Sequence, residues 1–366
     1  MTTQSHSDYH GFEQGPIRPP SEAESLLLRV TRNCPWNRCK FCPVYKGTEF
    51  SRRPVEHVKR DIDAVYQCLQ EMAGELQDPR ARQAARHWLR CGKRQVFLQD
   101  ANSLALDPGG LLEILRHLKH RFPEVQRITS YARSSTVARL APQTLAALKA
   151  AGLDRLHLGM ESGSDEVLRE MHKGTTQKQQ VLAGLKVKQA GMELSEYYMP
   201  GLGGRRSCSA NARETAKALN RINPDFIRLR TLAIPFQTPL YEDWRAGRFQ
   251  KPTDVEMARE ILLFLESLDG ITSRVVSDHI LNLLPEVEGN LPGDRERMIR
   301  VVESFLALDP EGQCLFQVGR RTGAMSRLQD LENPARVARV AELCRENGIT
   351  PENVDNLTGE WMRRFV

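Results

Sequence analysis

Apolar residues along the chain follow two alternating patterns. Short runs rich in β-branched and aromatic residues predict strands, and longer segments with a period near 3.6 residues predict amphipathic helices. The six predicted strands are 25–31, 94–100, 127–132, 155–160, 193–199 and 226–234. The helices predicted after the first five strands are 54–72, 107–122, 141–152, 165–174 and 209–222. This alternation predicts an α/β fold with parallel strands and helices outside them.

Six strand–helix units with polar residues after the strands favour a partial (β/α)6 barrel, and a doubly wound open sheet is the alternative. After about residue 245 the strand signal fades, and the chain becomes helical and charged. We therefore expect three parts. They are a flexible N-terminal arm at 1–20, the partial barrel at 21–245 and a mainly helical C-terminal region at 246–366.

Composition narrows the class of protein. No apolar run approaches the roughly 20 residues that cross a bilayer, and residues 1–20 lack the basic start and apolar core of a signal peptide. We therefore expect a cytoplasmic protein with no membrane contact. The 52 basic and 46 acidic residues give a net charge of +6, which is mild for 366 residues. It favours anionic ligands and does not by itself indicate nucleic acid.

Three of the eight cysteines, Cys34, Cys39 and Cys42, fall within nine residues in a C-x4-C-x2-C pattern after the first predicted strand. The other five cysteines lie singly along the chain, so the spacing does not indicate a set of structural disulfides. A closed zinc site needs four ligands, and the fourth would have to come from His57, Cys68 or farther away. Three thiolates can instead hold three irons of a [4Fe–4S] cluster and leave the fourth iron open to another ligand.

The stretch "CPWNRCKFC" resembles the signature of the radical S-adenosylmethionine (SAM) superfamily, in which an aromatic residue, here Phe41, precedes the last cysteine. The resemblance implies a [4Fe–4S] cluster on Cys34, Cys39 and Cys42 with SAM on the open iron. In the family, electron transfer cleaves SAM and starts radical chemistry, so a reducing protein such as flavodoxin or ferredoxin and oxygen sensitivity are also implied. The usual spacing is C-x3-C-x2-C, so this chain has one extra residue between the first two cysteines.

Three further stretches carry the resemblance. "LHLGMESGSDEVLREMHKGTT" (156–176) is similar to the branch that contains oxygen-independent coproporphyrinogen oxidases, tRNA methylthiotransferases and the elongator catalytic subunit. "VFLQDANSLAL" (96–106) and "YYMPGLGG" (197–204) correspond to the turns after the second and fifth strands. The SAM contacts that the resemblance implies are Phe41, Asp100, Asn102, Ser103, Glu161, Ser162, Lys173, Met199 and Gly201.

The residues that could contact the substrate are less clearly indicated by the sequence. We expect Asp278 and His279 to lie on the first turns of a helix within 274–298, where they either handle substrate protons or fasten the C-terminal region to the barrel. Arg228 and Arg230 share one face of the sixth strand. If that face points inward, it would suit an anionic substrate or the SAM carboxylate, and if it points outward, the arginines would be solvated.

The leading hypothesis is a radical SAM enzyme acting on an unidentified small molecule, with an anionic one favoured. RNA-base modification is the alternative within the enzyme class, but the chain has no recognisable RNA-binding module, so nucleic acid is not expected. A non-catalytic iron–sulfur electron carrier and a zinc-stabilised binding protein are alternatives of a different class. Binding and cleavage of SAM distinguish the enzyme from both.

Overall fold

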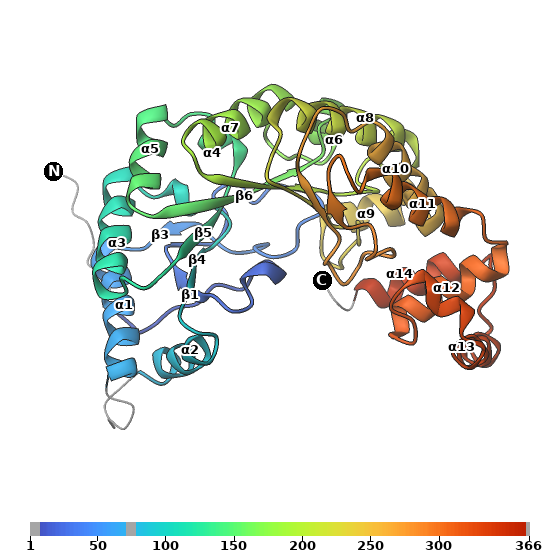
Figure 1. Ribbon diagram of the computed structural model, residues 1–366, viewed down its shortest axis with the longest axis horizontal. Helices are drawn as coiled ribbons and strands as arrows, with labels where there is room; N and C mark the ends of the chain where they lie inside the picture. Colours follow the sequence, from blue (N-terminus) through green and yellow to red (C-terminus); the bar gives the residue numbers. More distant parts are fainter. Residues whose placement is uncertain (1–7, 71–77, 364–366) are drawn as a thin grey trace. The chain divides into compact units, whose positions relative to one another are not determined.

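The computed structural model describes residues 8–70 and 78–363 (Figure 1). The chain divides into two compact units, each assembled from several segments. The first unit comprises Met1–Pro35, Gly47–His157 and Gln189–Glu193. The second unit comprises Trp36–Lys46, Leu158–Lys188 and Leu194–Val366.

The first unit is built on three parallel strands, β1 (Leu26–Arg29), β4 (Gln95–Gln99) and β5 (Arg127–Ala132), which pair in this order. Val96 of β4 lies between Leu26 of β1 and Ile128 of β5, and all three side chains are buried. Burial on both faces of β4 explains why its centre, 96–98, is a continuous apolar run. Helix α1 packs against α2 and α3 (Figure 1). The helices of this unit are α1 (Val55–Gln70), α2 (Pro79–Arg90), α3 (Pro108–Arg121), α4 (Ser134–Val137) and α5 (Pro142–Ala150).

The described part of the expected flexible arm makes specific contacts within the first unit. The Tyr9 hydroxyl donates a hydrogen bond to Asp61 at 2.9 Å, and the Phe12 side chain is buried. The Gly15 backbone N–H donates to the Gln99 side chain at 2.8 Å. Hydrogen bonds thus connect residues 8–19 to α1 and β4, and the flexibility of the arm stays a prediction. Residues 1–7 of that arm and 71–72 of the expected first helix lie outside the described residues.

The second unit continues the parallel arrangement. Strand β6 (Leu153–Glu161) begins in the first unit and ends in the second, where β7 (Glu193–Tyr198), β8 (Phe226–Leu229) and β9 (Arg274–Val276) follow in parallel and β10 (Gly289–Asn290) pairs antiparallel with β9. The helices of this unit are α6 (Asp165–Glu170), α7 (Gln177–Gln189), α8 (Gly204–Ile222), α9 (Pro239–Arg245), α10 (Asp254–Glu266), α11 (Arg295–Leu306), α12 (Pro310–Thr322), α13 (Pro334–Glu346) and α14 (Val354–Met362).

The predicted parallel α/β fold is confirmed. Within each unit the strands lie in chain order without reversal, whereas a doubly wound sheet reverses its strand order at a switch point. All six predicted strands are present within a few residues of their expected bounds. The sequence pattern missed β9 and β10, because runs of three and two residues carry too little periodicity to stand out from the surrounding helices.

The C-terminal part of the chain is largely helical, with α10 to α14, as the pattern predicted. The boundary placed at residue 245 stays a prediction. Among the described helices, none has the length and apolar character required to cross a membrane.

Candidate active site

A short antiparallel ladder in the first unit holds both ends of the cysteine-bearing segment. It joins β2 (Thr31–Arg32) to β3 (Ser51–Arg52). Asn33 follows β2 with a φ of 67°, a left-handed conformation that asparagine tolerates better than most residues. Its backbone N–H donates to the Asp100 carboxylate at 3.0 Å, which fixes the approach to Cys34. Cys34 lies in the first unit, and the other two cysteines of the motif lie in the second.

The segment that carries Cys39 and Cys42 is attached to two helices of the second unit. The Lys40 backbone N–H donates to the Met171 carbonyl at 3.0 Å, and the Leu240 backbone N–H donates to the Lys40 carbonyl at 3.0 Å. The Lys40 ammonium also pairs with Asp243 of α9 at 2.8 Å. Backbone and side-chain bonds on both sides of Lys40 therefore fix this part of the loop between the end of α6 and α9.

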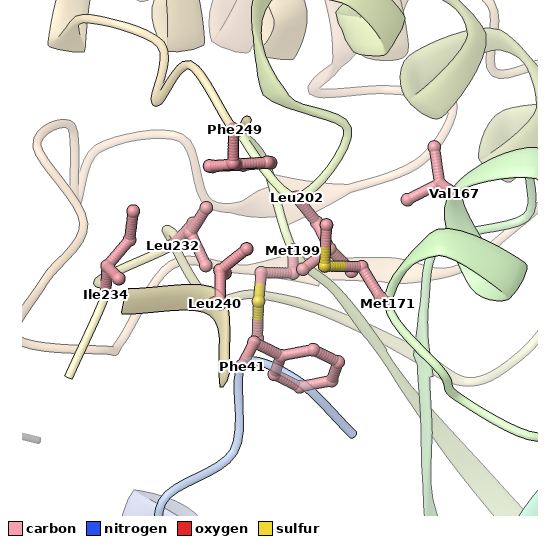
Figure 2. Close-up of a cluster of buried hydrophobic side chains, with 9 residues drawn as sticks. All are labelled: Phe41, Val167, Met171, Met199, Leu202, Leu232, Ile234, Leu240 and Phe249. Atoms are coloured by element: carbon pink, nitrogen blue, oxygen red, sulfur yellow. The ribbon is translucent and has the colours of Figure 1, made fainter. Parts of the chain in front are cut away.

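Phe41 lies at one edge of a buried apolar cluster (Figure 2). Cys39 and Cys42 also pack against this cluster. The cluster is formed by Phe41, Val167, Met171, Met199, Leu202, Leu232, Ile234, Leu240 and Phe249. These side chains come from the cysteine loop, from α6 and the residue that follows it, from the turns after β7 and β8, and from α9 and the loop after it. Residues far apart in the sequence thus form one apolar wall around two of the three cysteines.

Glu161 and Lys173 meet as the twelve-residue spacing of the motif implies. The Lys173 ammonium donates to Glu161 Oε1 at 3.1 Å, and it lies 5.6 Å from the centroid of the Phe41 ring. The other carboxylate oxygen, Glu161 Oε2, is buried without a hydrogen-bond partner among the described residues. A side chain at Gly159 would lie only 2.5 Å from Glu161 Oε1, so a glycine there leaves room for the carboxylate.

The extra residue of the cysteine motif lies in a segment that contacts the turn carrying Lys173. The Trp36 indole N–H donates to the His172 carbonyl at 2.7 Å. Gly174 has a φ of 68°, and a Cβ at this position would lie 2.3 Å from the Trp36 ring. The longer loop therefore places an indole directly against the backbone of this turn.

The expected SAM contacts after β4 form hydrogen bonds with other residues of the first unit. Asp100 is fully buried, and its Oδ2 accepts from Arg29 at 2.8 Å and from the Asn33 backbone. The Asn102 amide donates to the Thr136 hydroxyl at 2.9 Å, and its carbonyl oxygen accepts from the Arg133 backbone. The buried Ser103 hydroxyl is hydrogen-bonded to the carbonyls of β4. A contact between these three residues and SAM stays a prediction.

The expected SAM contacts after β6 and β7 are Ser162, Met199 and Gly201, and each has a different kind of neighbour. Ser162 is buried, and its hydroxyl accepts from the Ser164 backbone at 3.0 Å. Met199 belongs to the apolar cluster beside Phe41. Gly201 has a φ of 88°, and its backbone N–H donates to Glu260 of α10 at 3.0 Å.

Glu260 organises the glycine turn from outside the motif. Besides Gly201, its carboxylate accepts from the Tyr198 hydroxyl and from the Asn211 amide, both at 2.7 Å. Burial outweighs these hydrogen bonds and raises the pKa of Glu260 to about 7. A side chain of the C-terminal region thus holds the turn in which Met199 and Gly201 lie.

The expected helix at 277 is wrong. Asp278 and His279 lie in a loop after β9, and the next helix, α11, begins only at Arg295. Short polar side chains hydrogen-bond the backbone of this loop and compete with helical bonds, as the Ser277 hydroxyl does by donating to the Leu284 carbonyl at 3.0 Å. Asp278 pairs with Arg228 at 2.6 Å.

The sequence of residues 28–206 matches the model of the radical SAM superfamily. Residues 28–206 are a radical SAM domain. This stretch includes the three cysteines, Glu161 and Lys173. Enzymes of the superfamily use a [4Fe–4S] cluster and SAM.

Relatives of the radical SAM domain include the tRNA-2-methylthio-N(6)-dimethylallyladenosine synthase of Acidithiobacillus ferrooxidans. It is 27% identical over 199 residues, which are 53% of this chain and 40% of that protein. The 4'-phospho-dehydrooxetanocin synthase of Priestia megaterium is 29% identical over 191 residues, 46% of this chain and 22% of that protein. The chain therefore spans less than half the length of either relative. The match to the methylthio synthase is consistent with the branch of the superfamily that residues 156–176 resemble, because that branch contains tRNA methylthiotransferases.

Among solved structures, the coproporphyrinogen III oxidase of Escherichia coli, described as a radical SAM enzyme, is similar with a TM-score of 0.43 and 16% identity. The match covers 64% of this chain and 50% of that chain.

The donor set of the radical SAM domain fits an iron–sulfur cluster. The side chains of Cys34, Cys39 and Cys42 are all partly buried. Within residues 8–70 and 78–363, no three histidine, cysteine, aspartate or glutamate side chains form a group that could hold one metal ion. A [4Fe–4S] cluster makes a different demand from a mononuclear zinc site, because each thiolate binds a separate iron.

One polar residue of the domain was missed by the sequence reasoning. Glu196 of β7 is fully buried, and neither of its carboxylate oxygens has a hydrogen-bond partner in the described part of the chain. Burial and then the Glu161 carboxylate raise the pKa of Glu196 well above its usual range, while Lys173 acts in the opposite direction. The available signal was a glutamate in the middle of the predicted strand "ELSEYYM", which the motif comparison did not single out.

Proposed function

We propose that this chain is a radical SAM enzyme in which Cys34, Cys39 and Cys42 hold a [4Fe–4S] cluster next to bound SAM. The observation that carries the proposal is the arrangement of Phe41, Glu161 and Lys173 beside Cys39 and Cys42. Residues that the motif spaces across more than 130 positions meet in the second unit, with one carboxylate oxygen left free to accept hydrogen bonds. An electron carrier or a zinc-stabilised binding protein has no need for such a group.

Each proposed contact has a chemical reason. The Lys173 ammonium suits the carboxylate of SAM, and the free oxygen of Glu161 suits the ribose hydroxyls. Phe41 and Met199 offer an apolar surface for the adenine, and the glycine at 201 lets the backbone approach a flat ring. Asp100, Asn102 and Ser103 hold the end of β4 and the approach to Cys34, and Ser162 braces the turn after β6. When bound, the cluster and SAM supply the radical chemistry, while the protein supplies position and shielding from water.

The partners follow from the same proposal. A reducing protein such as a flavodoxin or a ferredoxin would deliver the electron, and a reducing compartment such as the cytoplasm suits a chain with eight cysteines and no disulfide framework in its sequence pattern. We propose a small molecule with an anionic group as the substrate. RNA-base modification is the second candidate, favoured by the name of the methylthio synthase relative. Turnover of SAM with transfer RNA but not with small phosphorylated compounds would select the second candidate.

The test is anaerobic reconstitution with iron and sulfide, followed by EPR of the reduced protein with and without SAM and chromatography of the SAM products. We expect a [4Fe–4S]+ signal that SAM shifts, with 5′-deoxyadenosine formed. Cys34→Ala, Cys39→Ala and Cys42→Ala should each lose the signal. Cys91→Ala removes another partly buried thiol outside the motif and should retain it. One zinc per chain with no effect of SAM would refute the proposal.

A further inference from the structure

A second pocket of the second unit is lined by residues of α8, α9 and α14 and of the loop that precedes α10. Its volume is about 90 Å³, which is enough for several water molecules and therefore for one group of the size of a phosphate. Lys251, Asp355 and Arg363 contribute charged side chains, and Trp244 contributes an aromatic one. None of its described lining residues is a cysteine of the motif or a proposed contact of SAM.

Lys251 brings an ammonium group without a partner to this pocket. Its side chain is partly buried, and no hydrogen bond or ion pair joins it to another described residue. The ammonium lies against α14, since a Cβ at Gly359 would be 3.5 Å from Lys251 Nζ. Burial lowers the pKa of Lys251, while the Asp254 carboxylate acts in the opposite direction. An ammonium that has lost water without gaining a partner is stabilised by an anion that binds next to it.

The two carboxylates that act on Lys251, those of Asp254 and Asp355, have other partners. Both oxygens of Asp254 accept hydrogen bonds from Arg321, at 3.0 and 3.1 Å. Oδ1 of Asp355 accepts from the Asp254 backbone N–H at 2.7 Å. Because neither carboxylate pairs directly with Lys251, its three N–H donors are available to a ligand.

Arg363 is held at the same pocket by an aromatic ring. Its guanidinium carbon lies 4.7 Å from the centroid of the Trp244 ring, and its Nε donates to the Gly359 carbonyl at 3.3 Å. These two contacts fix the guanidinium and leave its two terminal nitrogens without an acceptor among the described residues. Arg363 therefore supplies a second, pre-positioned set of donors.

We propose that Lys251 and Arg363 bind the terminal phosphate of a small molecule in this pocket. Arg205 also lines the pocket, but Glu256 pairs with it at 2.9 Å. The two remaining cations outnumber the one carboxylate of the lining, Asp355, so the pocket favours an anion.

A phosphate monoester suits this pair of cations. It carries about two negative charges and three acceptor oxygens, so it can accept charge-assisted hydrogen bonds from an ammonium and a guanidinium together. The volume holds one such group and not a run of backbone phosphates, which favours a small molecule over a nucleic acid. This inference goes beyond the proposed function, because the site shares no residue with the proposed SAM contacts and does not require cleavage of SAM.

The test is calorimetric titration of the full-length, reconstituted protein with methyl phosphate, a monoester, and with dimethyl phosphate, a diester. The monoester should bind more tightly. Lys251→Met keeps the apolar stem but loses the charge, and it should weaken binding of methyl phosphate by about tenfold or more. Lys251→Arg keeps the charge and should recover most of that loss. Lys178→Met, the same substitution at an exposed position of α7, is the matched control and should bind like the unsubstituted protein.

Equal affinities for Lys251→Met and Lys178→Met would overturn the assignment, provided that both variants unfold at the same temperature as the unsubstituted protein. If Lys251→Met does not fold, Arg363→Gln takes its place in the comparison, and an unchanged affinity in that variant would overturn the assignment as well.

Two further outcomes contradict the proposal. Tighter binding of dimethyl phosphate would exclude a terminal phosphate and indicate a phosphodiester ligand. Displacement of methyl phosphate by SAM would place the pocket within the SAM site. Failure of the unsubstituted protein to form 5′-deoxyadenosine is a separate measurement, which would refute the proposed function and leave the phosphate site unaffected.

Discussion

The acidic and polar candidates of the two units differ in how many of their hydrogen-bonding atoms have partners. In the first unit, Asp100, Asn102 and Ser103 are buried and engaged in hydrogen bonds to neighbouring residues. In the second unit, one carboxylate oxygen of Glu161 and both of Glu196 lack a hydrogen-bond partner among the residues that the structure describes. Buried polar atoms are nearly always satisfied, so the unsatisfied carboxylate oxygens of Glu161 and Glu196 are better candidates for contact with a ligand than the engaged side chains after β4.

The largest effect on stability is expected in the first unit. Asp100→Ala removes the nearest acceptor of Arg29 and the acceptor of the Asn33 backbone N–H. The largely buried Arg29 guanidinium then keeps only the Asn33 side chain at 3.2 Å and Glu13 at 3.9 Å. We expect a loss of about 3 kcal/mol in the free energy of unfolding, measured by urea denaturation of the apoprotein. If Asp100→Ala unfolds like the unsubstituted protein but fails to bind SAM, the carboxylate serves the cofactor and the contrast between the units disappears.

The buried carboxyl of Glu260 predicts that the free energy of unfolding depends on pH. Its pKa of about 7 in the folded protein lies above the value of 4.5 for an unperturbed glutamate. Between these values the unfolded chain loses its proton first, so the stability contributed by protonated Glu260 is present below about pH 4.5 and is lost as the pH rises to about 7. The expected loss is up to about 3 kcal/mol, at roughly 1.4 kcal/mol per pH unit.

Glu260→Gln should remove that pH dependence, since the amide does not titrate. The measurement is the difference in unfolding free energy between the two proteins at several pH values. A constant difference from pH 4.5 to 7.5 would mean that Glu260 ionises normally and that burial does not dominate its surroundings.

Lys173→Met should affect SAM more than the fold. The side chain keeps its apolar contacts but loses the charge that pairs with Glu161 and faces Phe41. We expect the dissociation constant for SAM to rise about tenfold to a hundredfold, with a stability change below roughly 1 kcal/mol. Lys178→Met, at an exposed position of α7, is the control. A drop in stability without weaker SAM binding would place Lys173 in the same class as Asp100.

The smallest effect is expected for Glu196→Gln. Because burial raises the pKa of Glu196 well above its usual range, the carboxyl is mainly neutral, and the amide is a close substitute in shape and charge. The unfolding free energy should change by less than about 1 kcal/mol at pH 6. A much larger destabilisation would show that the ionised carboxylate is required, so that the pair of carboxylates around Lys173 carries more charge than inferred.

The sequence by itself determined the parallel α/β alternation, because apolar periodicity follows directly from which faces a strand or helix buries. It also determined the three cysteines and the spacing of Glu161 and Lys173, because ligand chemistry and motif spacing are local properties of the chain. Local pattern was insufficient at residue 277, where the side chains of Ser277 and Asn282 satisfy the loop and no helix forms.

Only the tertiary structure decided which polar groups have free capacity. Arg228 and Arg230 are two residues apart and looked equivalent in the sequence, but Asp278 neutralises the first and not the second. The hydrogen bond from Gly201 to Glu260 and the burial of Glu196 could not be inferred from the sequence either. Hydrogen-bond partners and desolvation depend on residues distant in the chain, so they are set when the chain packs and not by its local order.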